Sequence, residues 1–149
     1  MKKLIVIATL FLLGLGCNVM AGVDPSCYLK TGEKTYFGQK LKIGLKSTKI
    51  ISNDGTVVKV PNSKVKCCME GSRFFELLPT VNVEYDTTGY VIMEYVTSKN
   101  GLKLYFYDNL TKGPASREFY VFADEGIYLK GDEKNASNMF AFFGITSQE

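Results

Sequence analysis

The sequence predicts a mainly β fold, an antiparallel meander forming a small barrel or sandwich, followed by one short C-terminal helix. In most segments apolar side chains alternate with polar ones, which is typical of strands with one buried face. Dipeptides that favour tight turns separate these segments. With 46% hydrophobic and 22% charged residues, the composition is that of a globular protein.

In the first half, residues 40–46 alternate lysine with leucine and isoleucine, which predicts a strand. Residues 48–52 and 56–60 flank Asn53-Asp54-Gly55, and Asp-Gly readily adopts the positive φ of a hairpin turn. The next strands are predicted over residues 63–69 and over residues 73–78, the latter ending at Pro79.

In the second half, Asn100-Gly101 predicts a type I′ turn between strands at residues 90–97 and 102–107. A further hairpin joins residues 118–122 to 127–130. The helix is predicted over residues 135–143, with Asn135 as its N-cap and Gly144 at its C′ position. Its apolar face would consist of Ala136, Met139, Phe140 and Phe143.

Residues 1–21 have the pattern of a secretory signal peptide. Lys2 and Lys3 precede an apolar run of about twelve residues, too short to span a membrane, and Val19-Met20-Ala21 is a cleavage site. The mature chain is therefore predicted to be a single β-rich domain, residues 22–149, that is exported to the periplasm or the extracellular space and has no transmembrane span.

A second interpretation of the leader is a lipoprotein signal with Cys17 as the lipidated residue, which would anchor the protein to the envelope. An aliphatic residue usually stands three positions before such a cysteine, and here that position is Gly14. The sequence therefore favours soluble export.

Three cysteines remain after cleavage: Cys27, Cys67 and Cys68. If Lys64 and Lys66 face solvent, strict alternation places Cys67 inside and Cys68 outside. We therefore predict a Cys27–Cys67 disulfide. A strained bridge between the two neighbouring cysteines and three reduced thiols are the alternatives.

The charges are unevenly distributed. Residues 34–69 contain eight lysines and one acid, a net charge of +7. If the strands pair as predicted, five lysines share the solvent side of one meander and form a candidate polyanion-binding site: Lys40, Lys42, Lys59, Lys64 and Lys66. Its partner could be an anionic glycan, lipid headgroups or a negatively charged envelope protein.

Nucleic acid fits this site less well, because the chain has only two arginines and no aromatic residue interleaves with the lysines. The plainer interpretation is that the lysines solvate sheet faces and edges and prevent aggregation.

The sequence contains no histidine, which excludes Ser-His-Asp and Cys-His catalysis and removes the commonest zinc ligand. Because it also lacks phosphate-binding loops and clusters of metal ligands, no cofactor or metal is predicted. A carboxylate-dependent glycan hydrolase remains an alternative. No motif selects a pair among the candidate acids, which are Glu70, Glu76, Glu84, Glu94 and Glu118.

The leader, the lysine-rich β meander and the segment Asn100-Gly101-Leu102-Lys103-Leu104-Tyr105 resemble small exported β-rich proteins of Bacteroidetes-type bacteria. Lys134-Asn135-Ala136 and Phe142-Phe143-Gly144-Ile145 add to the likeness. The resemblance implies a periplasmic or outer-surface location and transfers no catalytic residue.

Together these observations predict an exported, non-enzymatic β domain that acts through a surface, as a binding module or as part of an envelope assembly. A structural subunit of a cell-surface assembly is a further alternative, which a long unpaired edge strand would favour.

Overall fold

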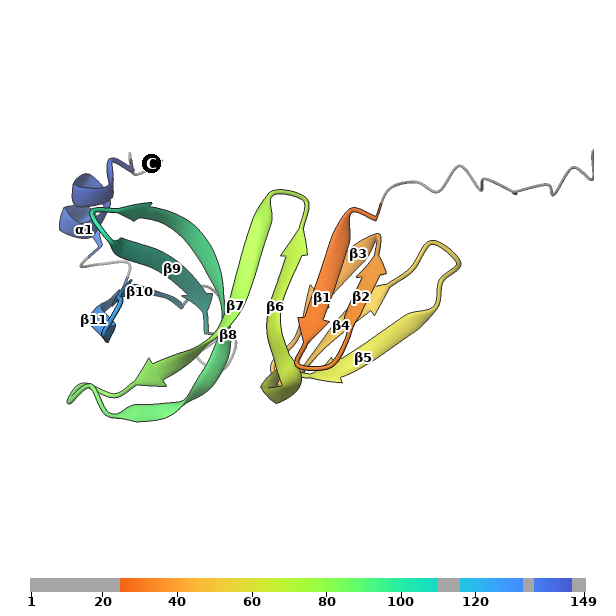
Figure 1. Cartoon of the computed structure of the whole chain (residues 1–149). Helices are drawn as coiled ribbons and strands as arrows, with labels where there is room; N and C mark the ends of the chain where they lie inside the picture. Colours follow the sequence, from red (N-terminus) through yellow and green to blue (C-terminus); the bar gives the residue numbers. More distant parts are fainter. Residues whose placement is uncertain (1–24, 110–115, 133–135, 146–149) are drawn as a thin grey trace, which may run out of the picture.

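The computed structural model describes residues 25–109, 116–132 and 136–145 and contains two antiparallel sheets (Figure 1). The large sheet has eight strands in the order β11-β10-β9-β8-β7-β6-β1-β2, and the small sheet has the order β3-β4-β5. The bounds of the strands are β1 Cys27–Thr31, β2 Thr35–Gly38, β3 Lys40–Ile43, β4 Ser47–Ile51, β5 Val57–Pro61, β6 Val65–Glu70, β7 Arg73–Val81, β8 Thr87–Lys99, β9 Leu102–Asp108, β10 Arg117–Ala123 and β11 Gly126–Asp132.

A short 3₁₀ helix, η1 (Asn62–Lys64), precedes β6, and one α-helix, α1 (Ser137–Phe143), follows β11. The predicted mainly β fold with a short C-terminal helix is confirmed, and the two sheets pack as a sandwich without closing into a barrel. The predicted signal peptide and Cys17 lie outside the described residues. No helix of the described segments is long and apolar enough to cross a membrane.

The predicted hairpins are present. Asn100 and Gly101, between β8 and β9, both have positive φ, at 52° and 79°, as a type I′ turn requires. Gly55, between β4 and β5, has φ 81°. These turns formed as predicted because the sequence signal lies within the turn itself.

Strand β7 does not end at Pro79 as predicted but continues to Val81, with Pro79 opposite Tyr90 of β8. Strand β6 pairs with β7 only as far as Glu76. Beyond that residue none of the described strands pairs with this side of β7, and a residue without an N–H group is tolerated at such an edge.

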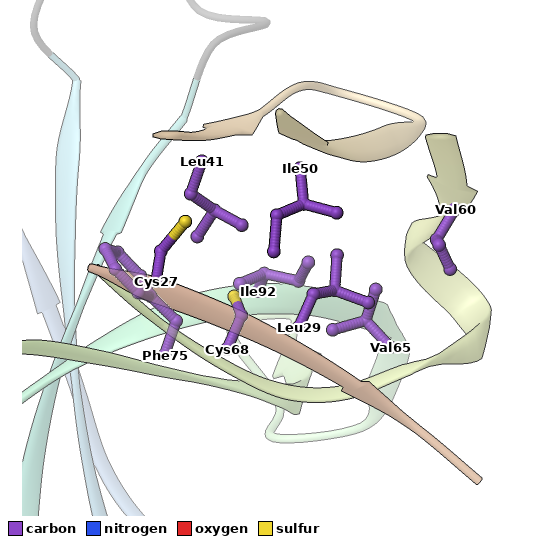
Figure 2. Close-up of a cluster of buried hydrophobic side chains, with 9 residues drawn as sticks. All are labelled: Cys27, Leu29, Leu41, Ile50, Val60, Val65, Cys68, Phe75 and Ile92. Carbon is purple, nitrogen blue, oxygen red and sulfur yellow. The ribbon is translucent and has the colours of Figure 1, made fainter. Parts of the chain in front are cut away.

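The small sheet packs its inner face against the large sheet (Figure 2). Leu41, Ile50 and Val60 from β3, β4 and β5 join core residues of the large sheet that include Leu29 and Val65. All five are almost completely buried. This aliphatic core determines which side of the small sheet faces solvent.

The chain passes from the large sheet to the small one between β2 and β3. A Cβ atom on Gly38 would lie 2.6 Å from the carbonyl oxygen of Ile51, so the close approach of the strands requires glycine. The backbone N–H of Gln39 donates to the same carbonyl, at 2.8 Å. This junction ties β4 to the edge of the large sheet.

The C-terminal half of the large sheet carries a hydrophobic core on each of its faces. Tyr105 and Tyr120 belong to the core on one face, and Leu104 and Phe119 belong to the core on the other. Helix α1 covers the second face. The predicted apolar side of the helix is confirmed, because all four of its residues belong to this core: Ala136, Met139, Phe140 and Phe143.

Gly144 ends α1 with φ 74°, as predicted. The N-cap position is occupied by Ala136, whose side chain makes no capping hydrogen bond. The predicted cap, Asn135, lies outside the described residues.

A β-bulge in β6 reverses the predicted orientation of the neighbouring cysteines. Val65 lies opposite Thr31, and Cys67 lies opposite Lys30, so Lys66 is the extra residue. The bulge breaks the alternation, and Val65 and Cys68 both face the core. Cys68 is therefore fully buried and Cys67 only partly buried, the reverse of the prediction.

The predicted Cys27–Cys67 disulfide is also corrected. Cys27 lies opposite Glu70 and belongs to the core together with Cys68, whereas Cys67 points to the other face of the sheet. All three thiols are free. Burial raises the pKa of the Cys68 thiol to about 12.

Candidate functional site

Three lysines form a straight row across the small sheet. The strand register places Lys42 opposite Lys49, and Lys49 opposite Lys59. Directly opposed residues in antiparallel strands point to the same face. All three side chains are exposed, so the row lies on the solvent side of the small sheet.

The buried core fixes the orientation of this row. Leu41, Ile50 and Val60 alternate with the lysines and are buried between the two sheets (Figure 2). A shift in register by one residue would exchange the two faces and bury the lysines, which the loss of core burial opposes. The row is therefore as well defined as the core beneath it.

Lys40 is the fourth member of this face, two residues before Lys42 on β3. It lies opposite Ile51, which in turn lies opposite Val57. We call the set Lys40, Lys42, Lys49 and Lys59 the lysine face. Within the described residues none of the four forms an ion pair.

The other two lysines of the predicted site lie elsewhere. Lys64 belongs to η1, and Lys66 is the bulge residue of β6 in the large sheet. A Cβ atom on Gly32 would lie 3.8 Å from Lys66 Cε, so this side chain lies beside the connection between β1 and β2. The prediction that all five lysines share one surface is therefore wrong for these two.

Lys49 was missing from the predicted site, although its signal is present in the sequence. Thr48 and Ile50 on either side of it are buried, so alternation alone would have placed Lys49 on the solvent face. The structure thus retains three of the five predicted lysines and adds a fourth in their centre.

Asn62 anchors the end of the lysine face nearest to η1. Its side-chain Nδ2 donates to the carbonyl oxygen of Gly44, at 2.8 Å, and its Oδ1 accepts from the hydroxyl of buried Thr48, at 2.9 Å. These bonds join the β3–β4 turn to the end of β5. They hold all three strands of the face in register.

A cleft of about 290 Å³ lies beside the small sheet, on the face of the large sheet that β3 partly covers. Its floor comes from β6, β7, β8 and β9, and one wall comes from β3 and the turn that follows it. Its lining includes polar and aromatic side chains: Asn62, Glu70, Arg73, Phe75, Tyr90, Glu94, Phe106, Tyr107 and Asp108.

Two of the acids considered for hydrolysis line this cleft, Glu70 and Glu94. Both oxygens of Glu94 accept hydrogen bonds from Arg73, at 2.8 and 2.6 Å. Glu70 Oε1 accepts from the backbone N–H of Leu41, at 3.0 Å. One of the two carboxylates is therefore fully engaged by a guanidinium group.

The remaining acids lie away from the cleft. Glu76 accepts a hydrogen bond from Tyr105, and Glu118 accepts one from Tyr120, at 3.0 Å. Burial, together with the neighbouring carboxylate, raises the pKa of both tyrosines. Glu84 lies in the β7–β8 turn, where its N–H donates to an asparagine side chain.

The two edges of the large sheet are β2 and β11. On β11 the backbone N–H of Lys130 donates to the hydroxyl of Tyr85, at 3.4 Å, and Lys130 Nζ donates to the carbonyl oxygen of Val81, at 2.9 Å. The β7–β8 turn therefore covers part of this edge, as natural sheets commonly require. A structural subunit would be expected to have a long unpaired edge strand, and β11 is partly covered.

Across the described ranges no three His, Cys, Asp or Glu side chains are grouped in a way that could hold a metal ion. No protein-family model, curated protein or solved structure matches the chain. The candidate sites therefore rest on their own geometry, in which the lysine face and the cleft occupy different surfaces.

Proposed function

We propose that the protein is an exported, non-enzymatic binding domain that holds a linear anionic glycan across its lysine face. Export is supported by the signal-peptide pattern of residues 1–21. Anion binding is supported by four ammonium groups on one face of a three-stranded sheet, whose potential attracts negative charge.

The position of Lys49 is the observation that carries this proposal. Lysines on edge strands protect a sheet from aggregation, which accounts for Lys42 on β3 and Lys59 on β5. Strand β4 lies between these two edges and needs no such protection. Like charges directly opposite each other destabilise a sheet, so the row has a cost that a bound anion would offset.

The shape of the row favours a linear partner. Neighbouring strands are about 4.8 Å apart, so the three lysines form a ladder perpendicular to the strands. A glycan with one carboxylate on each sugar presents its charges in a line of the same kind. Nucleic acid is disfavoured because the outer rows that flank these lysines contain Ser47, Ile51, Val57 and Pro61 but no aromatic side chain for base stacking.

The test is binding to immobilised polygalacturonate, with uncharged dextran as the negative support. We expect Lys49→Glu to weaken binding about tenfold, because it places an acid in the centre of the row. Lys103→Glu is the matched control, since Lys103 is exposed on β9 of the large sheet and the change in net charge is the same.

Three results would contradict the proposal. They are an equal loss of binding in the two variants, equal retention on dextran, and a preference for vesicles containing phosphatidylglycerol over polygalacturonate. The last result would indicate that the lysine face binds a membrane surface instead of a glycan.

A further inference from the structure

The cleft beside β3 combines a hydrogen-bonding floor with an exposed aromatic rim, and neither feature belongs to the lysine face. We infer that this cleft binds a neutral sugar ring. This inference is independent of the proposed function, because no lysine of the lysine face lines the cleft.

The floor of the cleft is a ladder of charged side chains that crosses three strands: Glu70 on β6, Arg73 on β7 and Glu94 on β8. Arg73 binds Glu94 through Nε and Nη2. Within residues 25–109, 116–132 and 136–145, Arg73 Nη1 and Glu70 Oε2 form no hydrogen bond. The ladder therefore offers a ligand one donor, Arg73 Nη1, and one acceptor, Glu70 Oε2. Neighbouring hydroxyl groups of a sugar suit this arrangement, because each hydroxyl can both donate and accept a hydrogen bond.

The ladder fixes the orientation of Arg73. Its ion pair with Glu94 is bidentate, and a bidentate pair between an arginine and a carboxylate can also contribute to stability. Arg73 is half-exposed, yet its guanidinium group also lies 5.0 Å from the ring centroid of Phe75. This contact, together with Glu94, holds the guanidinium group in a fixed plane at the base of the cleft, as recognition of a ligand requires.

Tyr90 supplies an aromatic surface at the rim. Its side chain is 64% exposed on β8 and lines the cleft together with Leu45 of the opposite wall, which is 55% exposed. One face of a pyranose ring consists of C–H groups, and such a face packs against an aromatic ring while the hydroxyl edges remain available for hydrogen bonds. The cleft offers both kinds of contact.

The charge and size of the cleft narrow the class of ligand. Its lining contains three carboxylates and one guanidinium group, which disfavours the anions expected on the lysine face. Its volume of about 290 Å³ lies at the lower end of the usual range for ligand pockets. A single neutral sugar ring meets both conditions.

The experiment is an NMR titration of the ¹⁵N-labelled protein with the methyl glycosides of glucose, galactose, mannose and N-acetylglucosamine. We expect at least one of them to shift the amide resonances of Tyr90 and Arg73. We expect Tyr90→Ala to weaken this binding at least tenfold, and Tyr90→Phe to retain it because the ring remains.

Tyr128→Ala is the matched control, because Tyr128 is 65% exposed on β11 and does not line the cleft. It should leave the affinity for the sugar unchanged. So should Lys49→Glu, which separates this inference from the proposed function. The inference is overturned if none of the four glycosides shifts cleft resonances, or if the two tyrosine-to-alanine variants bind equally well.

Discussion

The two ends of the large sheet are buried in different ways. Where the small sheet packs on it, the core consists of aliphatic side chains, two thiols and Phe75, and the charges lie outside. In the half formed by β7 to β11, aromatic rings dominate and a carboxylate is buried, since Glu118 is only 6% exposed. One continuous sheet therefore combines an apolar sandwich with a core that depends on hydrogen bonds.

The contrast shows which interactions stabilise each half of the large sheet. The sandwich depends mainly on close packing, with one buried hydroxyl, that of Thr48, bonded to Asn62. Its outer face is therefore free to carry a row of lysines. The C-terminal half must keep partners for its buried acid, and Tyr120 and Lys130 supply them, at 3.0 and 3.4 Å. Substitutions should therefore act through packing in the first half and through polar contacts in the second.

The largest effect is expected from Ile50→Ala in the sandwich. Ile50 is 1% exposed, and its truncation should lower the free energy of unfolding by about 2–5 kcal/mol. Val57→Ala, on the outer face of the same sheet and 52% exposed, should lower it by less than about 1 kcal/mol. Urea denaturation measures both, and similar losses would contradict the sandwich packing.

Alkaline pH should destabilise the protein through Cys68. Its thiol has a pKa of about 12 in the folded protein and 9.0 without burial, so above pH 9 the unfolded chain loses this proton first. Stability should be unaffected by this group below pH 9 and should then fall by at most about 1.4 kcal/mol per pH unit until about pH 12.

The comparison for this prediction is Cys68→Val. Thermal unfolding should be measured from about pH 8, where the thiol is protonated in both states, to about pH 11, where only the folded state keeps its proton. The stability of the variant should decline less steeply over this range. A decline of the same steepness would assign the effect to other groups. Tyr105 and Tyr120, whose pKa values are raised as well, would be the next to replace.

Tyr120→Phe should have an intermediate effect in the C-terminal half. It removes a hydroxyl that donates to buried Glu118, and leaving a buried polar group without one partner costs about 1–3 kcal/mol. Tyr128→Phe removes an exposed hydroxyl and should change stability by less than about 0.5 kcal/mol. Equal values in chemical denaturation would show that the hydrogen bond to Glu118 contributes nothing.

The smallest effect has the opposite sign. Lys49→Thr removes two like-charge contacts and introduces a residue with high strand propensity, so it should stabilise the protein by about 0.2–1 kcal/mol. The gain should shrink at high salt, where these repulsions are screened. A loss of stability at low salt would mean that the row is not self-repulsive.

The sequence predicted the features whose signals are local. Asn100-Gly101 defines its own turn, and the spacing of Met139 and Phe143 defines the buried side of α1. The orientation of Cys67 and Cys68 could not be predicted, because it depends on a bulge that forms only when β6 pairs with β1. The passage of β7 through Pro79 likewise depends on which neighbouring strand is present.

The candidate sites also differ in whether their signal is local in the sequence or depends on how the strands pair and pack. The alternation in β3 and β5 was enough to place Lys42 and Lys59 on one face, and the same pattern in β4 would have added Lys49. Lys66 was misplaced because of the bulge. The cleft was not predicted, because its floor and its wall come from strands far apart in the sequence and meet only through the packing of the two sheets.

The most direct test of the account is to map where polygalacturonate binds, using the backbone amide resonances of the full domain. The account predicts shifts on the outer face of β3, β4 and β5, centred on Lys49, that disappear when NaCl is raised from about 0.05 M to about 0.5 M. Shifts confined to η1 and β6, or shifts that persist at the higher salt concentration, would contradict it.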